Sequence, residues 1–523
     1  MRRLRSASVT APYDLAVVGS GFAGSLLAMI ARRQGRSVIL LEKGQHPRFA
    51  IGESSTPLSN LLLEGLALRY DLPGIAPLAK FGTWMDAYPN LDCGLKRGFT
   101  FYHHHFGRRA ATDPHRADQL LVAASPHDRI ADTHWFRAGF DHHFVCEARK
   151  TGVEYWDQVE LRSAVEYGDR VELQGSRRGA GVAISARFVV DATGPRGFLH
   201  RAFALDELPL PDFPQTQALY THFRGVRRLD EINGDDAPYP IDDAAVHHIF
   251  DGGWIWVLRF RSGITSAGVA MVDSLAARLH LSDGAPAWER LLDSLPTVRG
   301  QFADAVAERP FTYAPRLAFR SARVAGPRWA LLPSAAGFVD PLLSTGFPLV
   351  LLGVTRLAQL MEDSWGCADL SNYAALTTAD LLATAKLIGA LYASMDNFPL
   401  FTSLSLLYFA TASFAETARR LQKDHLADSF LLHSHPLFKE QFASLLQRAT
   451  QVRGDEETVQ LASDILRAIE PFNVAGLGRP ERRNWYPADA ADLLHAASKL
   501  ESNPEEITRM LHNCAFWPTS SIR

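Results

Sequence analysis

The chain has 523 residues, of which 47% are hydrophobic and 21% charged, a composition typical of globular proteins rather than disordered or fibrous ones. Its formal charge of −3 gives no reason to expect nucleic acid or an acidic membrane as a partner. The basic N-terminus has no long apolar segment, so we expect no signal peptide. Four widely spaced cysteines form no CxxC pair, which indicates neither a disulfide framework nor a zinc cage and fits a reducing cytoplasm: Cys93, Cys146, Cys367 and Cys514.

The first motif begins with an apolar run, residues 14–18, which suits a buried parallel strand. Gly19, Gly21 and Gly24 then give the spacing GxGxxG. In this spacing the first glycine permits a tight turn, the second admits a pyrophosphate and the third lets helix pack on strand. A second strand, "SVILLE", ends in Glu42, which is placed to accept hydrogen bonds from a ribose. The order of these elements predicts a dinucleotide-binding unit.

Two later segments favour FAD over NAD. "RFVVDATGPRG" places an apolar strand before Asp191, and "HWFRAGFD" carries Arg137 and Asp141 ahead of a helix. Together they resemble the two-domain flavoprotein monooxygenases of the hydroxybenzoate-hydroxylase type. No second GxGxxG is evident, so we expect no NAD(P)H domain in the chain.

This resemblance implies an α/β (α+β) fold: a Rossmann-like FAD-binding domain, an inserted β-sheet substrate domain and a helical C-terminal region. The expected boundaries are 12–80, 130–200 and 315–375 for the FAD-binding domain, 81–129 and 205–314 for the substrate sheet, and 376–523 for the helical region. The longest apolar-looking region, residues 387–414, contains Asp396, Asn397 and Pro399. We therefore expect two packed helices there and no transmembrane segment.

Three further motifs sharpen the resemblance: "IGESSTP" from Ile51, the tryptophan pair of "WIWVL", and "GFVDPLLSTG" before a helix. With GxGxxG they resemble the flavin-dependent halogenases, most closely the phenol- and phloroglucinol-type branch, over most of the chain to about residue 420. The halogenase motif FxPxSxG is matched by Phe338, Pro341, Ser344 and Gly346. The motif WxWxIP is matched only in its tryptophans, because residues 258–259 are Leu-Arg. FAD-dependent hydroxylation of an aromatic compound therefore stays open as the alternative.

These halogenases need one lysine between flavin and substrate, and two lysines compete for the role. Lys80 lies in "PLAKFGTW", whereas Lys96 lies in "CGLKRGFTF", which matches a "CGIKLGFSF"-like strand of the phenolic branch. The resemblance implies that reduced FAD, O₂ and chloride or bromide give hypohalous acid, which the lysine confines. It does so either as a chloramine-type species or by orienting the acid. Desolvation lowers the pKa of a lysine and makes such a role chemically accessible. We expect Lys96 to be this residue.

The resemblance also implies the other site residues. Cofactor-binding residues are expected at Gly19, Gly21, Phe22, Ala23, Gly24, Glu42, Lys43, Gly52, Glu53, Ser54, Arg137, Asp191, Asp340 and Gly346. Halide-binding residues are expected at Ser344, Thr345 and Gly346. Residues lining the substrate tunnel are expected at Phe101, His103, Trp254, Trp256 and Pro341.

The expected partners are a separate NAD(P)H-dependent flavin reductase and a small aromatic substrate, free or attached to a carrier protein. The triplet His103-His104-His105 raises the question of a metal. Successive strand residues point to opposite faces, so at most His103 and His105 share one. Without a clear third ligand, the sequence predicts no metal site.

Overall fold

The computed structural model describes residues 11–109, 113, 115–229, 237–363 and 367–517. The predicted strand–helix–strand unit is present as β1 (Tyr13–Val18), α1 (Phe22–Arg33) and β2 (Val38–Leu41). The central residues of both strands are fully buried, as expected for parallel strands that are covered on both faces.

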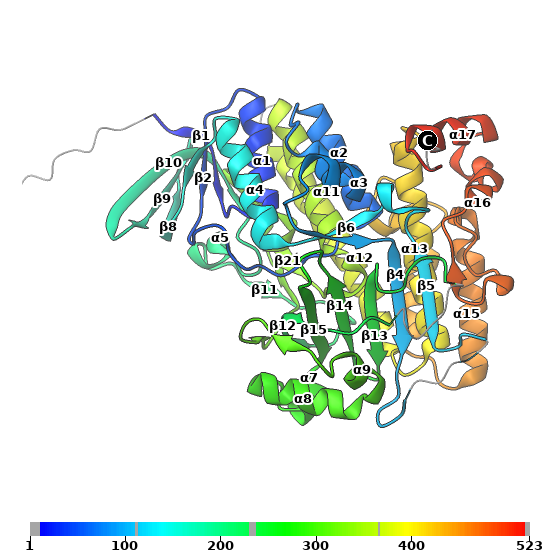
Figure 1. Cartoon of the computed structure of the whole chain (residues 1–523). Coiled ribbons are helices and arrows are strands. Elements are labelled where there is room, and N and C mark those ends of the chain that lie inside the picture. The colour runs from blue at the N-terminus through cyan, green and yellow to red at the C-terminus, as the bar shows by residue number, and fades with distance from the viewer. Residues whose placement is uncertain (1–10, 110–112, 114, 230–236, 364–366, 518–523) are drawn as a thin grey trace, which may run out of the picture.

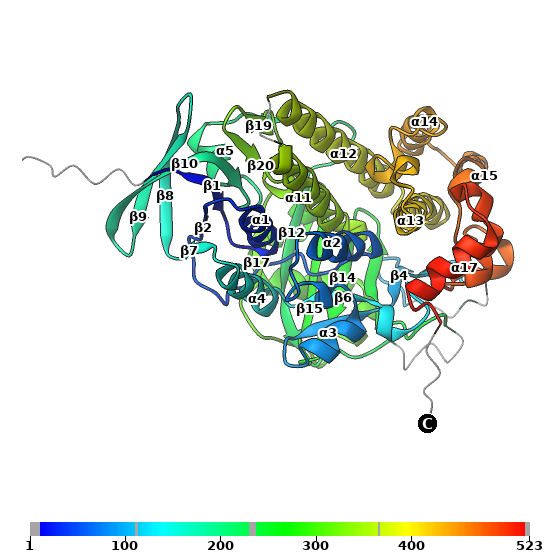
Figure 2. The same ribbon diagram turned by 90° about the horizontal axis from the view of Figure 1, so that it is seen from above.

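β1 and β2 belong to a mixed eight-stranded sheet, the FAD sheet, in which β10, β1, β2 and β7 run parallel (Figure 1). Its strand order is β19-β20-β10-β1-β2-β7, and β9 and β8 extend it from β10 as an antiparallel ribbon. The other strands are β7 (Glu154–Trp156), β8 (Val159–Glu166), β9 (Val171–Arg177), β10 (Ala180–Asp191), β19 (Ala325–Gly326) and β20 (Trp329–Leu331). Helices α1, α4 (Arg137–Lys150) and α11 (Gly346–Asp363) pack together beside it (Figure 2).

A second, nine-stranded sheet, the substrate sheet, has the order β16-β12-β15-β14-β13-β4-β5-β22, and β17 also pairs with β12. Its strands are β4 (Gly98–His103), β5 (Gln119–Ala123), β12 (Thr216–Arg224), β13 (Ala245–Phe250), β14 (Gly253–Arg259), β15 (Thr265–Val272), β16 (Val306–Ala307), β17 (Thr312–Ala314) and β22 (Trp485–Tyr486). β22 is a strand within the C-terminal region that was expected to be helical.

The two faces of the substrate sheet are covered differently, and β14 shows the alternation. Ile255 and Val257 face a core formed with α7 (Asp273–Arg278), α8 (Ala285–Ser294) and α9 (Pro296–Gln301). Trp254 and Trp256 face a core shared with α12 (Cys367–Ala393) and α13 (Phe398–Arg420). The period of two therefore places both tryptophans on one face, as the sequence predicted.

The apolar region 387–414 is divided between α12 and α13, with Asn397 accepting a hydrogen bond from the Leu400 amide at the start of α13. The prediction of two helices is thus confirmed. By length and composition alone, three segments could cross a membrane: Leu342–Glu362, Asp369–Ala393 and Phe398–Arg420. The most apolar windows of these segments are 72%, 61% and 83% buried inside the protein, so packing accounts for their composition.

β3 (Cys93–Lys96) and β6 (Asp132–Trp135) form a separate two-stranded ribbon that connects the substrate sheet to the helices beside the FAD sheet. β3 continues through one residue into β4, and β6 continues through one residue into α4. The antiparallel register places Lys96 opposite Asp132. A small third sheet has the order β11-β18-β21 (Glu207–Leu208, Phe319–Ser321, Gly337–Phe338).

The remaining α-helices are α2 (Pro57–Arg69), α3 (Phe81–Ala87), α5 (Phe198–Ala202), α10 (Pro333–Ala336), α14 (Lys439–Ala449), α15 (Asp455–Ile469), α16 (Ala490–His495) and α17 (Pro504–Asn513). Figure 1 shows α15, α16 and α17 stacked beside α13 at the side of the molecule away from β8 and β9. The predicted fold class, a Rossmann-like FAD-binding unit with a substrate sheet and a largely helical C-terminal region, is confirmed.

Candidate active site

The glycine loop before α1 has no room for side chains at two of its three positions. Gly19 has φ +103°, and a Cβ there would lie 2.6 Å from the Ala192 carbonyl oxygen. A Cβ on Gly24 would lie 2.1 Å from the Gly19 carbonyl oxygen. At Gly21, by contrast, a Cβ would meet only side-chain tips, with Arg137 Nη2 at 3.6 Å and Arg48 Nη2 at 3.9 Å. The start of α1 therefore faces a space flanked by two guanidinium groups.

Arg137 connects three segments around this space. Its guanidinium makes two hydrogen bonds to the buried Asp141 carboxylate, at 2.8 and 2.9 Å, and donates to the carbonyls of Ile51 and Gly52. Asp141 in turn accepts a bond of 3.2 Å from the Phe22 amide at the start of α1.

Nearby, two buried nitrogens, Arg48 Nε and His46 Nδ1, have no hydrogen-bond partner among the described residues. Cationic and donor groups at the N-terminus of a helix fit the pyrophosphate of FAD.

Glu42 lies next to the loop, as predicted for a ribose-binding acid. Its carboxylate accepts hydrogen bonds from the Ser20 amide, the Ser20 hydroxyl and the Gly44 amide, at 3.2, 2.8 and 2.8 Å. Burial alone would raise the pKa of Glu42, but Arg48 and these donors hold it below its ordinary value, so the group is ionised. Lys43 instead points to solvent, and its Nζ lies 3.7 Å from the Glu160 carboxylate.

Asp191 and Asp340 use their carboxylates within the protein. Asp191 accepts from the Thr193 amide at 2.9 Å and from the Leu199 amide at 2.5 Å, which closes the turn after β10. Asp340 accepts from Trp254 Nε1 at 3.1 Å and from the Tyr392 hydroxyl at 2.9 Å. These bonds give both acids an evident structural role.

The loop after Ile51 reaches the substrate side. Gly52 adopts φ +86°, a conformation that favours glycine, and its carbonyl faces Arg137. Glu53 is buried and lies 2.9 Å from His222 Nε2. Ser54, expected to bind cofactor, accepts a hydrogen bond of 2.9 Å from Lys96 Nζ. This loop therefore joins the FAD side of the molecule to the lysine.

An aromatic cluster joins the N-termini of α1 and α11. The ring of Phe347 lies 5.2 Å from Phe22 and 4.4 Å from Trp135, measured between centroids. Ala23 is buried in the same core. The cluster therefore joins the glycine loop, the predicted halide loop and β6 through Phe22, Phe347 and Trp135.

The predicted halide loop runs from Pro341 to Gly346. Leu343 and Ser344 both have positive φ, +62° and +56°, and a Cβ at Gly346 would meet no atom within 4 Å. Thr345 is buried. The first turn of α11 follows, and a helix start leaves backbone N–H groups without partners inside the helix. The Leu343 carbonyl accepts a bond of 3.0 Å from the Tyr408 hydroxyl, which fixes the loop to α13.

Lys96 is fully buried. Two aromatic rings, Phe99 and Tyr408, connect it to the predicted halide loop. Its Nζ donates to the Ser54 hydroxyl and, at 2.5 Å, to the Ser55 carbonyl, and it lies 3.8 Å from the centre of the Phe99 ring. Phe99 packs against Tyr408, which holds the Leu343 carbonyl. Among the described residues, no carboxylate oxygen lies within 4.0 Å of Nζ, so the amine has no direct ion-pair partner.

Asp132 lies opposite Lys96 in the pairing of β3 with β6, and the sequence did not predict that these two residues meet. Asp132 Oδ1 accepts a hydrogen bond of 2.8 Å from Asn60 Nδ2, whereas its Oδ2 is buried and has no hydrogen-bond partner in the part of the chain that the structure describes. Burial lowers the pKa of Lys96 and raises that of Asp132, although each charge partly offsets the effect on the other. The sequence could not show this pair, because it depends on how β3 and β6 align.

The rival lysine has a different environment. Lys80 lies at the start of α3, where its Nζ is 2.6 Å from the Glu64 carboxylate and 23% of its side chain is exposed. The amine of Lys80 is therefore engaged by a carboxylate, whereas, among the described residues, that of Lys96 is not. The structure thus distinguishes the two lysines by burial and by pairing.

Two adjoining clefts lie beside the Lys96–Asp132 pair. The first, of about 650 Å³, is lined by the aromatic residues Phe99, Tyr408 and Phe409 together with α13 and residues 475 and 477. The second, of about 1000 Å³, is lined by polar groups that include Asp132, Glu64 and Arg420.

Four of the residues expected to line the substrate tunnel lie on strands β4 and β14 of the substrate sheet: Phe101, His103, Trp254 and Trp256. Phe101 and His103 are not among the described residues that line either cleft. Phe101 stacks on His247, 4.5 Å away, and His103 lies at the far end of β4. Trp254 and Trp256 are buried on the face of β14 toward α12 and α13, with their ring centroids 5.6 Å apart. Phe99, two residues before Phe101, is the ring that contacts the lysine, and the period of two could have indicated it.

Residues 14–310 match the family model described as FAD dependent oxidoreductase. The chain is 30% identical over 420 residues to the tetracycline 7-halogenase of Kitasatospora aureofaciens, covering 77% of this chain and 73% of that protein. The chain belongs to the flavin-dependent halogenases. The halogenase is also 29% identical to the monodechloroaminopyrrolnitrin halogenase PrnC of Pseudomonas fluorescens, over 66% of its own length and 61% of that protein.

The fold of the halogenase matches the crystal structure of halogenase PltM with a TM-score of 0.81, at 25% identity, covering 91% of this chain and 99% of that one. The relatives support FAD-dependent halogenation and not hydroxylation. The alternative left open by Leu258 and Arg259 is therefore overturned.

Proposed function

We propose that this halogenase chlorinates or brominates a phenolic or other electron-rich aromatic compound, and that Lys96 delivers the halogen. The observation that carries the proposal is the environment of Lys96 Nζ. The amine is fully buried, lacks an ion-pair partner among the described residues, and lies over a ring that lines a cleft. A lysine on an open strand edge would instead be solvated and charged.

Reduced FAD, when bound, supplies with O₂ the oxidising equivalents that turn halide into hypohalous acid. The neutral amine of Lys96 then takes up the halogen, forming an N–halogen bond and releasing water. The aromatic ring attacks this halogen, so that a carbon–halogen bond forms as the N–halogen bond breaks. The amine recovers a proton, and the ring carbon loses one. Holding the halogen on one nitrogen prevents a diffusible oxidant from reacting elsewhere.

Asp132 is the acid that we propose as the acceptor of the proton lost by the ring. Its unpartnered Oδ2 and its place in the wall of the second cleft support this role. Because burial raises the pKa of Asp132, the group can exchange a proton near neutral pH.

The halide is proposed to bind at Ser344, Thr345 and Gly346, in front of α11. The left-handed conformations of Leu343 and Ser344 and the N-terminus of the helix support an anion there. Pro341 begins this loop, and the bond from Tyr408 keeps it fixed toward the Phe99 side of the first cleft.

The aromatic lining of the first cleft supports an aromatic substrate. PltM has been crystallised with phloroglucinol, a phenol, and another relative, 26% identical, is a chlorinase of a pyrrole carried by a peptidyl-carrier protein. A free phenol and an aromatic ring bound to a carrier protein are therefore the two kinds of substrate to compare. A separate flavin reductase is proposed to supply the reduced FAD, and the cytoplasm is the proposed compartment.

The test is halogenation of a panel of free and carrier-bound phenols with chloride or bromide, reduced FAD and O₂, read by mass spectrometry. Lys96→Ala should lose roughly 10³-fold in product while it retains FAD, and Asp132→Asn should lose about 10²-fold. Lys386→Ala, an exposed lysine on α12, is the matched control and should keep full activity. Halogenation that survives in Lys96→Ala but is lost in Lys80→Ala would assign the reaction to the rival lysine.

A further inference from the structure

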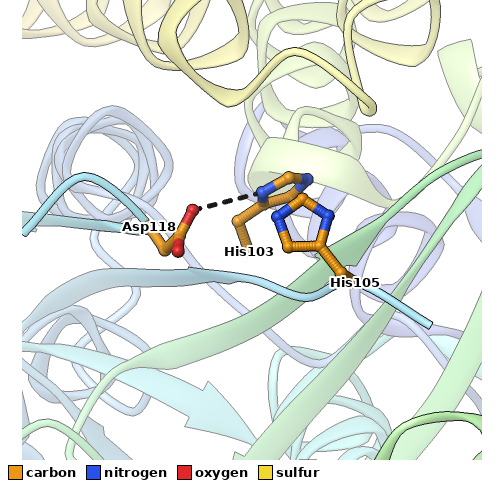
Figure 3. A group of neighbouring side chains, drawn as sticks. All are labelled: His103, His105 and Asp118. Carbon is orange, nitrogen blue, oxygen red and sulfur yellow. Dashed lines mark hydrogen bonds and ion pairs between the residues drawn. The ribbon is translucent and has the colours of Figure 1, made fainter. Parts of the chain in front are cut away.

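His103 and His105, at the end of β4, lie beside Asp118, an acid that the sequence provided no reason to place near them. His103 ends β4, His105 follows two residues later, and Asp118 immediately precedes β5 (Figure 3). A backbone bond of 2.9 Å from the His103 amide to the Asp118 carbonyl holds the two strand ends together. One ligand atom from each of the three side chains lies within 4.8 Å of the others. The third ligand, whose absence led the sequence analysis to expect no metal, is thus present.

The hydrogen bonds of His103 determine which ring nitrogen is free. Its Nε2 lies 3.0 Å from the Met395 carbonyl oxygen, which can only accept, so Nε2 carries the hydrogen. The other ring nitrogen, Nδ1, faces the carboxylate of Asp118, whose Oδ1 lies 3.4 Å away, so a metal ion between them would have a ligand atom on each side.

The spacing of these two atoms fits a metal better than a hydrogen bond. Nδ1 of His103 and Oδ1 of Asp118 are 3.4 Å apart. A charge-assisted hydrogen bond between such groups would be about 2.7–2.9 Å long. Two ligands at about 2.0–2.1 Å from a tetrahedral zinc ion lie about 3.4 Å apart. The ring of the exposed His105, whose centroid is 4.7 Å from that of His103, supplies the third ligand (Figure 3).

We propose that His103 Nδ1, a ring nitrogen of His105 and Asp118 Oδ1 bind one zinc ion, with water in the fourth position. Two imidazoles and a carboxylate are ligands that zinc takes readily. The Met395 carbonyl is the outer partner that orients the His103 ring. This site is separate from the halogenation chemistry, because β4 carries it at the end opposite Lys96.

Zinc at this position would be structural. Met395 lies in the turn between α12 and α13, and the His103 ring stacks on Phe398 at the start of α13, 5.1 Å away. The ion would therefore join both strands of the β4–β5 pair at the point where the substrate sheet meets the turn between α12 and α13. Metal binding to the folded state alone stabilises that state.

The full-length protein is treated with EDTA, desalted, and titrated with ZnCl₂. The wild type should retain one zinc ion per chain after a second desalting, and its Tm should rise with zinc. His105→Ala and Asp118→Asn should bind zinc at least about tenfold more weakly and show no rise in Tm. Both variants change exposed or half-exposed side chains and should keep their FAD, whereas His103 is buried and its loss would disturb folding.

His495→Ala removes an exposed histidine of α16 and is the matched control, which should behave as the wild type. Replacing zinc by Co²⁺ should give the visible absorption of tetrahedral cobalt in the wild type and in His495→Ala only. Equal zinc retention by the wild type, His105→Ala and Asp118→Asn would show adventitious surface binding and overturn the proposal. Failure of the wild type to retain zinc would do so as well.

Discussion

At the scale of single residues, buried acids decide how this protein responds to pH. Asp340 accepts hydrogen bonds from the Leu342 amide, Trp254 and Tyr392, yet burial outweighs these donors and raises its pKa to about 7. Between the ordinary carboxyl pKa and this value, the folded chain holds a proton that the unfolded chain has released. The free energy of unfolding therefore falls as pH rises through this range.

Asp340→Asn tests this relation. The amide cannot ionise, its oxygen can accept from Trp254, and its NH₂ can donate to the Tyr392 hydroxyl. The stability of the variant relative to the wild type should rise between pH 5 and pH 7 by up to about 1.4 kcal/mol per pH unit and then level off. Urea unfolding at several pH values measures the difference, and a difference independent of pH would contradict the prediction.

Sequence reasoning at this scale singled out Lys96 but not Asp132, the acid opposite it. Lys96 lies in a local motif, whereas Asp132 meets it only through the register of two strands that are far apart in the chain. Asp118 was missed near His103 for the same reason. The bond from Tyr392 to Asp340 was missed as well, because nothing in the motif of Asp340 indicates a residue of α12.

At the scale of elements, the contact between α1 and β1 depends on the absence of one methyl group. A Cβ at Gly24 would lie 2.1 Å from the Gly19 carbonyl oxygen, whereas a Cβ at the exposed Gly65 of α2 would meet nothing within 4 Å. The same substitution at the two helical positions should therefore have opposite effects.

Gly24→Ala should displace α1 from the glycine loop and release FAD, measured as flavin retained after desalting with the helical content checked by circular dichroism. Gly65→Ala should keep its FAD and gain about 0.5–1 kcal/mol in free energy of unfolding, because alanine favours a helix more than glycine does. Full flavin retention in Gly24→Ala, or a loss of stability in Gly65→Ala, would refute this reading.

The α1–β1 unit was predictable because all of its signals lie within thirty residues of sequence. The division of the apolar region into α12 and α13 was predictable as well, from Asn397 and the proline that follows. The strand β22 was not, because two residues in a helical region carry no periodic signal and acquire their identity only by pairing with β5.

At the scale of the whole molecule, three long apolar helices are largely covered by the rest of the protein. We expect the halogenase to stay in the supernatant after ultracentrifugation without detergent, since most of the apolar surface of α11, α12 and α13 is covered. Fractionation of cells into membrane and soluble material measures this. Sedimentation with membranes and release only by detergent would show that these helices have a lipid-facing side.

The arrangement of the β3–β6 ribbon has a consequence for protein engineering. The lysine and its acid belong to this ribbon, but much of the first cleft wall comes from elsewhere, including Ala412 and Ser413 of α13 and the segment of Ala475 and Leu477. Libraries confined to these wall positions should alter which aromatic compounds are accepted, and which ring carbon is presented, while Lys96 and Asp132 stay in place. The chemistry proposed for Lys96 and the substrate range of the enzyme can thus be evolved separately.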